Sequence, residues 1–281
     1  MTNILEAIKN IILLNDKLVS GKSKSLTRAN SMGEALEEFV KDAFTDSFSL
    51  SDEEKLYQYN KHFSWLGSQN NPPDIIIRGG DAIEVKKIIN PKSSLALNSS
   101  YPKSTLKNSS PMITNECRRC EVWEEKDLIY TIGHTDKKDI KSLWFVYGSI
   151  YAAKQDTYER FKTLISEGIN TIPDVKFSET KELGRVNQVD PLGITNLRIR
   201  GMWQIQNPRR VFNYLHTQTD NKFELVAIVP TSKYNSFPND SKNRIENLGN
   251  QNLTINDVKV KDPNNPANLL DAKLIVFKVL N

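Results

Sequence analysis

The sequence is poor in the residues that build metal and disulfide sites: it has two cysteines and three histidines among 281 residues. The two cysteines, Cys117 and Cys120, form a Cys-x-x-Cys pair, which suggests zinc or redox chemistry. Zinc would need two further ligands, and no histidine stands at a zinc-finger spacing (His62, His134, His216). We therefore expect both cysteines to be structural or incidental thiols.

Long hydrophobic runs are also missing. No segment approaches the roughly 18 consecutive apolar residues of a membrane span. The first residues, Met-Thr-Asn-Ile-Leu-Glu, lack the basic region and apolar stretch of a secretory signal. Hydrophobic residues make up 38% and charged residues 26% of the chain, as in globular proteins of the cytoplasm, where we expect this protein to reside. Neither an internal repeat nor a flexible linker divides the chain, which predicts one domain over residues 1–281.

Acidic residues are missing from parts of the sequence, although the net charge is only +4. None occurs between Val85 and Asn115, a stretch with five lysines (Lys86, Lys87, Lys92, Lys103, Lys107). Residues 185–210 hold five arginines and one acid, and residues 22–28 add Lys22, Lys24 and Arg28. Basic segments of this kind favour contact with a polyanion. Taken singly, about half of these lysines are equally compatible with ordinary solvated side chains.

The most informative segment is 72–87, which reads as two short apolar strands around a Gly-Gly turn. Strand side chains alternate between faces, so Glu84 and Lys86 project to the same side. A three-residue loop at 79–81 would pair Ile76 with Glu84 and place Asp74 opposite Lys86. The three polar side chains then share one face of the hairpin. The other face is apolar (Ile75, Ile77, Ile83, Val85).

Two carboxylates and a lysine at one end of a sheet are the groups that metal-assisted phosphodiester cleavage needs. Asp74 and Glu84 would hold Mg²⁺, with the carbonyl of Val85 as a candidate further ligand. Lys86 would orient or activate the attacking water. We therefore predict a Mg²⁺-dependent nuclease site on this hairpin.

This arrangement resembles the PD-(D/E)XK nuclease signature, with Pro73-Asp74, nine residues, and then Glu84-Val85-Lys86. The same letters recur at Pro173-Asp174 and 179–181, but four intervening residues cannot form two antiparallel strands and a turn. The surroundings of this second match are polar, and we expect it to be a surface segment.

The predicted elements follow the αβββαβ order of the PD-(D/E)XK core, a mixed central sheet flanked by helices. Helices are expected at 3–14, from a cap at Asn30 or Ser31, at 115–132 and at 151–168. Strands are expected at 57–65, in the hairpin and at 143–147, and peripheral strands at 197–206, 224–229 and 273–279. On this interpretation the α/β core covers about residues 28–170, and residues 171–281 add strands for DNA recognition or dimerisation. Residues 90–114 would form a DNA-contacting loop.

In that fold the first core helix often supplies a third acidic residue to the active site, and Glu37 is our candidate. Alternatively, Glu37 is an ordinary residue on the solvent-exposed face of the helix. Arg198 and Arg200 share one face of a strand, which suits base reading or phosphate clamping, or else salt bridges. We expect further DNA contacts from basic and polar residues elsewhere (Lys24, Arg28, Asn30, Lys87, Lys103, Lys107, Arg118, Arg119).

Beyond the signature, several blocks resemble type II restriction endonucleases of the NgoPII family: residues 28–37, the hairpin, 111–120, 142–148 and 190–203. The resemblance implies Mg²⁺-dependent cleavage of both DNA strands at a short palindrome, which that family suggests is GGCC. It also implies a homodimer and a cognate bacterial DNA methyltransferase that protects the host. Two alternatives stay open: a structure-selective repair or recombination nuclease of the same fold, and a non-catalytic DNA-binding module.

Overall fold

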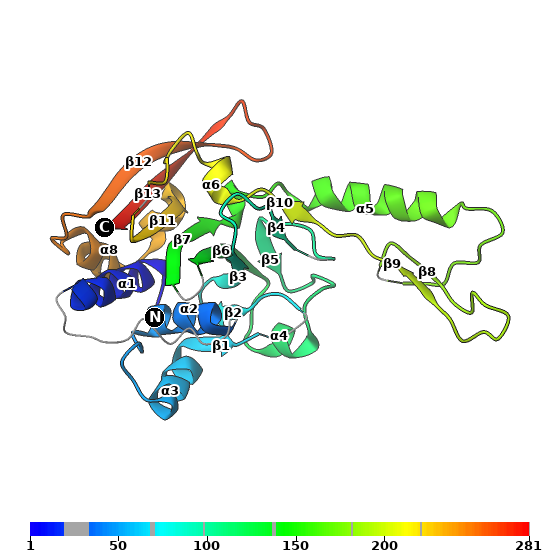
Figure 1. Cartoon of the computed structure of the whole chain (residues 1–281), viewed down its shortest axis with the longest axis horizontal. Coiled ribbons are helices and arrows are strands. Elements are labelled where there is room, and N and C mark those ends of the chain that lie inside the picture. The colour runs from blue at the N-terminus through cyan, green and yellow to red at the C-terminus, as the bar shows by residue number, and fades with distance from the viewer. Residues whose placement is uncertain are drawn as a thin grey trace.

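The computed structural model describes residues 1–19, 34–67, 71–97, 99–136, 139–180, 182–219 and 221–280. Its centre is a nine-stranded sheet (Figure 1). In spatial order the strands are β1 (Phe63–Trp65), β2 (Ile75–Ile77), β3 (Ala82–Ile88), β6 (Glu125–Asp136), β7 (Asp139–Tyr147), β11 (Phe223–Pro230), β13 (Leu269–Val279) and β12 (Leu253–Lys261), with β5 (Thr105–Lys107) paired to β6.

The sheet is mixed. The pairs β3·β6 and β7·β11 are parallel, and the other neighbours are antiparallel. Its inner strands are apolar along nearly their whole length, as in the buried run of β11, because elements cover both faces. The predicted mixed sheet flanked by helices is therefore confirmed.

The chain forms the following helices, of which all but α5 lie around the sheet (Figure 1). They are α1 (Ile4–Val19), α2 (Glu34–Thr45), α3 (Asp52–His62), α4 (Asn115–Arg119), the 3-10 turn η1 (Gly148–Ile150), α5 (Gln155–Asn170), α6 (Pro208–Val211), α7 (Thr231–Ser236) and α8 (Asn239–Glu246). The predicted helix at 3–14 is confirmed as α1, whose apolar stripe is fully buried (Ile4, Leu5, Ile8, Ile11, Ile12). In the part of the chain that is described, no helix has the length and apolar character needed to cross a membrane.

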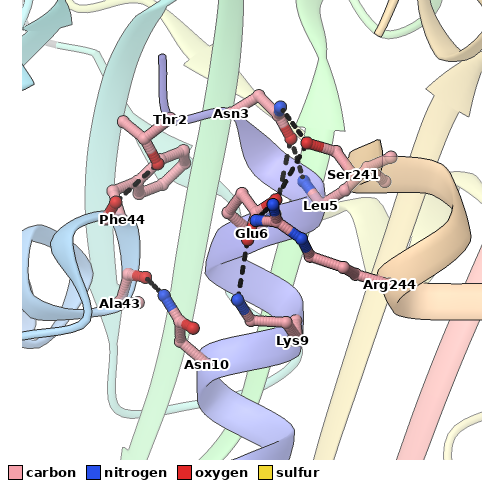
Figure 2. A network of polar contacts seen from close by, with 10 residues as sticks. All are labelled: Thr2, Asn3, Leu5, Glu6, Lys9, Asn10, Ala43, Phe44, Ser241 and Arg244. Atoms are coloured by element: carbon pink, nitrogen blue, oxygen red, sulfur yellow. Dashed lines mark hydrogen bonds and ion pairs between the residues drawn. The ribbon is translucent and has the colours of Figure 1, made fainter. Parts of the chain in front are cut away.

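Polar contacts fasten α1 to the helices on either side of it (Figure 2). Towards α2, the Asn10 side chain donates to the carbonyl of Ala43 at 2.9 Å. Towards α8, Glu6 accepts from the hydroxyl of Ser241 at 2.8 Å and pairs with Arg244 at 3.2 Å. Since α2 packs against both α1 and β3, this clamp fixes the helix that carries Glu37.

The expected strand at 57–65 is wrong over most of its length, because residues 52–62 form α3 and only Phe63–Trp65 is strand. The helix begins with a capping box in which the Ser51 hydroxyl accepts from the Glu54 N–H and Glu54 accepts from the Ser51 N–H. Acids fill its first turn and basic residues its last, which favours the helix dipole. These local signals favour a helix where a strand is predicted.

The expected helix at 115–132 is also wrong. Only α4 is helical there, capped by the Thr114 hydroxyl, and β6 begins at Glu125. The run Leu-Ile-Tyr-Thr-Ile within β6 is rich in β-branched and aromatic residues, which pack well in a buried strand.

Cys117 is buried and Cys120 is half-buried, and both are free thiols. The interpretation of the two cysteines as structural agrees with this.

Two of the strands expected at the periphery lie inside the main sheet instead. Residues 224–229 belong to β11, between β7 and β13, because this run is apolar on both faces. Residues 273–279 belong to β13, which β12 covers on its outer side. The segment 197–206 divides into β9 (Leu197–Ile199), paired with β8 (Gly184–Val186), and β10 (Gln204–Ile205), paired with β4 (Leu95–Ala96).

One part of the chain projects from the body. Helix α5, close to the predicted 151–168, extends outward together with β8 and β9 (Figure 1). We call residues 155–203 the arm. None of the residues of α5 is buried, although the helix is amphipathic.

The clamp on α1 gives a pH-dependent prediction. Burial raises the pKa of Glu6, but hydrogen bonds from Lys9 and Ser241 and the charge of Arg244 bring it below its ordinary value of 4.5. The folded state therefore holds the proton less tightly, so Glu6 stabilises the fold at neutral pH and this contribution is lost as the pH falls through 4.5 and below.

We expect Glu6→Gln to lower the free energy of unfolding at neutral pH by about 1 kcal/mol. The difference from wild type should shrink as the pH falls to about 4, measured by urea unfolding at both pH values. Glu167→Gln, at an exposed position of α5, is the matched control and should change little. A difference that stays constant with pH would show that the charge of Glu6 has no part in the clamp.

Candidate active site

The hairpin of β2 and β3 forms as expected, but in a different register. Ile75 pairs with Ile83 and Ile76 with Ala82, and the turn occupies residues 78–81. The expected pairing of Ile76 with Glu84 is wrong by two residues. The N–H of Ile77 donates to the carbonyl of Asp81, so the turn begins and ends one residue earlier in the chain than predicted. A shift of two leaves every side chain on its predicted face.

The shift gives Asp74 a different partner. Its N–H donates to the carbonyl of Ile83 at 3.1 Å, and its Oδ2 accepts from the N–H of Val85 at 2.6 Å. Asp74 therefore lies beside Glu84, and not opposite Lys86. The two carboxylates are closer in the sheet than the sequence suggested.

Lys86 compensates for this closeness. Its Nζ lies 2.6 Å from Oε1 of Glu84, in an ion pair whose side chains are 26% and 14% exposed. The other oxygen, Oε2 of Glu84, is buried and has no hydrogen-bond partner among the described residues. A buried carboxylate oxygen without a donor is costly, and a bound cation would satisfy it.

The electrostatics of the hairpin reflect two acids in a confined space. Burial, and then the charge of Glu84, raises the pKa of Asp74 to about 7. Burial alone would lower the pKa of Lys86, but the charges of Glu84 and Asp74 raise it above its ordinary value. The lysine therefore stays protonated, and the carboxylates favour a positive charge between them.

These residues fit a magnesium ion. Among the described residues there is no group of three or more His, Cys, Asp or Glu side chains that could hold a metal, which argues against an all-protein metal cage. Mg²⁺ keeps several waters and commonly takes only one or two carboxylates plus substrate phosphate. Asp74 and Glu84, with the orphaned Oε2, meet that requirement. The N–H of Val85 contacts Asp74, and its carbonyl stays a predicted ligand.

Helix α2 brings Glu37 towards the hairpin. The helix packs closely on β6, since a Cβ on Gly133 would lie 2.6 Å from the Leu36 side chain. The charge of Glu37 acts on both Asp74 and Lys86. Its side chain is 39% exposed and only loosely paired with Lys41, at 3.9 Å. Glu37 thus lies within electrostatic reach of the site, and its role there stays a prediction.

Residues 90–114 carry more structure than a free loop. Strands β4 and β5 lie within the segment, and Leu95, Leu97 and Leu106 are buried in the main core. The segment closes one side of a pocket of about 20 Å³ next to Glu84. Lys103 and Tyr130 line the same pocket. Tyr130 is not among the predicted site residues. It lies opposite Glu84 in the parallel pairing of β3 with β6, and only that pairing identifies it.

The basic residues predicted to bind DNA fall into two groups. Lys107 and Arg119 are exposed and Lys87 is half-buried on β3, so each can reach a ligand. Arg118 instead donates to the backbone carbonyls of Asn108, Ser110 and Ile113, which holds that loop and occupies its guanidinium. These bonds engage Arg118 in the free chain, and its phosphate contact stays a prediction. Lys24, Arg28 and Asn30, with the Ser31 cap, lie outside the described residues.

Arg198 and Arg200 lie on the arm, far along the chain from the hairpin. Both pair with Glu182, at 2.7 and 2.5 Å. The salt-bridge interpretation therefore describes the free chain, although each arginine keeps more than half of its side chain exposed (53% and 54%). The second signature match is an exposed segment, as predicted, with Asp174 in a left-handed conformation at φ 61°.

The sequence as a whole is similar to known proteins. The model of a family described as NgoPII restriction endonuclease matches residues 2–261. The type II restriction enzyme NgoPII of Neisseria gonorrhoeae is 49% identical over 279 residues, which covers 98% of this chain and 99% of that protein. No solved structure matches the chain.

The crowded carboxylates give a second prediction. We expect Asp74 in the metal-free protein to titrate near its raised pKa of about 7, followed by carbon NMR of its carboxyl. The folded state then binds the proton more tightly than the unfolded state, so the contribution of Asp74 to stability falls as the pH rises from 3.8 to about 7.

Glu84→Gln removes the neighbouring charge and should lower the pKa of Asp74. It should also flatten the loss of unfolding free energy over that pH range. Glu38→Gln, on the exposed side of α2, is the control and should leave the titration unchanged. An unaltered pKa of Asp74 in Glu84→Gln would refute the coupling of the two carboxylates.

Proposed function

Since the chain belongs to the NgoPII restriction endonuclease family, we propose that it is a Mg²⁺-dependent endonuclease that hydrolyses both strands of duplex DNA at a short palindrome. The family is one of type II restriction enzymes, which are site-specific deoxyribonucleases. The observation that carries the proposal is the hairpin edge, where Asp74, Glu84 and Lys86 lie together with an unsatisfied carboxylate oxygen.

In this proposal the fold is a PD-(D/E)XK core. Helix α2 precedes the strands β1, β2 and β3, the signature lies on the β2–β3 hairpin, and the chain then crosses over to β6, parallel to β3. The short helix α4 occupies part of that crossover. This order supports the assignment, with β11, β13 and β12 extending the same sheet.

The mechanism follows from the positions of the charged groups. Asp74 and Glu84 would hold Mg²⁺, which when bound supplies positive charge to stabilise the departing 3′ oxygen. Lys86, kept charged by its ion pair with Glu84, orients the attacking water for in-line attack on phosphorus. Glu37 adds a third negative charge at the rim of the site.

For recognition we propose that Arg198 and Arg200 exchange Glu182 for DNA, and that Lys87, Lys107 and Arg119 contact phosphates. Arginine is the common bidentate reader of guanine, which agrees with a G-containing site such as GGCC. A methyltransferase that modifies the same sequence would protect the DNA of the bacterial host.

We further propose a homodimer held by the arm. Cleavage of both strands at a palindrome needs two catalytic centres related by a two-fold axis, and each chain carries one signature hairpin. The arm exposes one apolar face of α5, in which Phe161, Leu164 and Ile165 are 48%, 57% and 47% exposed. It contains seven basic and seven acidic residues, so it has no net charge that would repel a second copy of the chain. A second copy of the chain fits this neutral, apolar surface.

The direct test is to incubate the protein with unmethylated phage DNA and Mg²⁺ and to sequence the fragment ends. Discrete fragments that share a palindromic end would support the proposal and give the site and the stagger of the cut. A smear, or cleavage of branched DNA alone, would favour a structure-selective nuclease. Intact DNA that is still retarded on a gel would favour a binding module.

A third prediction concerns the hairpin. Asp74→Ala, Glu84→Ala and Lys86→Ala should each abolish cleavage but leave binding to the recognition sequence largely intact, because the three groups act on the reacting phosphate. Gel retardation in EDTA and single-turnover cleavage in Mg²⁺ measure the two effects separately. Cleavage at the wild-type rate by any of the three variants would refute the assignment of that residue.

A fourth prediction concerns the arm. Leu164→Lys combined with Ile165→Lys should convert the dimer to monomers in sedimentation velocity, and should turn double-strand cleavage into nicking. Leu56→Lys is the matched control, since Leu56 lies on α3 with the same 57% exposure as Leu164. Retention of the dimer by the double variant would place the interface elsewhere.

A further inference from the structure

Lys103 lies in the pocket beside Glu84, although its chain segment is remote in sequence from the hairpin. It shares that pocket with Glu84, Tyr101 and Tyr130. The charges of Glu84 and Lys86 both act on it, so it lies within electrostatic reach of the site. The pocket therefore places a second lysine within electrostatic reach of Lys86.

The fold fixes this position through the backbone of Lys103. The hydroxyl of Tyr130 accepts from the Lys103 N–H at 2.7 Å and donates to the Lys103 carbonyl at 3.1 Å. On the other side, a Cβ on Gly148 would lie 2.5 Å from the carbonyl oxygens of Lys103 and Ser104, so the segment runs tightly over a glycine. Because Tyr130 pairs with Glu84 across β3 and β6, the same tyrosine fixes the lysine relative to the carboxylate.

The ammonium group has little compensation. Its Nζ donates to the hydroxyl of Ser100 and lies 5.3 Å from the centre of the Tyr101 ring. No carboxylate of the described residues forms an ion pair with it, whereas Lys86 has Glu84. Burial lowers the pKa of Lys103 to about 8, which reflects the cost of keeping it charged there. Keeping an ammonium charged in a partly buried site without a carboxylate partner is costly, and a bound anion would offset that cost.

We propose that Lys103 is a second catalytic lysine, whose ammonium contacts the scissile phosphate of DNA. This inference rests on the proposed function. The sequence predicts only that Lys103 contacts DNA, and the inference specifies that it contacts the phosphate that is cleaved. Lys86 faces the carboxylates and the water, and Lys103 binds the phosphate from the Tyr130 side. It stabilises the negative charge that grows on the phosphate oxygens during attack.

The test is a double-mutant cycle between the lysine and the phosphate charge. Wild type and Lys103→Met are compared on a duplex with a normal scissile phosphate and on one with a neutral methylphosphonate there. Affinities are measured in EDTA, where no cleavage occurs, after the fragment ends have identified the scissile bond. Lys259→Met, on the exposed strand β12, is the matched control.

We expect Lys103→Met to bind the normal duplex about tenfold more weakly and to be insensitive to the methylphosphonate, to which wild type responds. Single-turnover cleavage in Mg²⁺ should fall about 100-fold, and Lys103→Arg should recover part of it. Additive effects in the cycle, or cleavage by Lys103→Met within about threefold of wild type, would overturn the inference. Failure of the wild-type protein to cleave duplex DNA would instead contradict the proposed function.

Wild-type protein gives a measurement that does not depend on the folding of a variant. Acetylation of Lys103, mapped by mass spectrometry, should slow when the normal duplex is bound and should slow less with the methylphosphonate duplex. Equal acetylation with and without DNA would show that the ammonium does not face the phosphate. Protection by both duplexes to the same extent would also contradict the contact.

Discussion

The proximity of two carboxylates on the β2–β3 hairpin is the constraint on which the site depends. Asp74 and Glu84 are held together by backbone hydrogen bonds that leave neither free to move away. Burial, and then the charge of Glu84, raises the pKa of Asp74, and the charge of Lys86 offsets this only in part. The fold thus keeps a partly buried site in which a further positive charge is favourable.

Elements far from the hairpin maintain this arrangement. The clamp of α1 between α2 and α8 positions the helix of Glu37, and Gly133 lets that helix approach the sheet. On the other side of the sheet, Tyr130 ties the 90–114 segment to the strand next to Glu84. The sheet therefore brings together α2, the β2–β3 hairpin and the 90–114 segment, which are separate in the sequence.

The hairpin could be predicted from the sequence because its signals are local: alternation, a Gly-Gly turn and polar residues at fixed spacing. Its register could not, since moving the turn by one residue along the chain changes the pairing but leaves every side chain on the same face. The errors at α3 and β6 have different causes. At α3 the capping box of Ser51 and Glu54 begins a helix where a strand is predicted, and at β6 a β-branched and aromatic run pairs with β3 and β7 where a helix is predicted. The position of Lys103 depends on the Tyr130 contacts, which sequence spacing does not encode.

The ion pairs of Glu182 have a consequence for selectivity. A DNA duplex that takes Arg198 and Arg200 must first separate them from a carboxylate that holds both. A DNA sequence with well-placed acceptors for each guanidinium would offset the free energy lost when the ion pairs break. A single phosphate would not offset it. Under the proposed recognition by Arg198 and Arg200, Glu182 would compete with DNA for both arginines and raise the threshold for binding at unrelated sites.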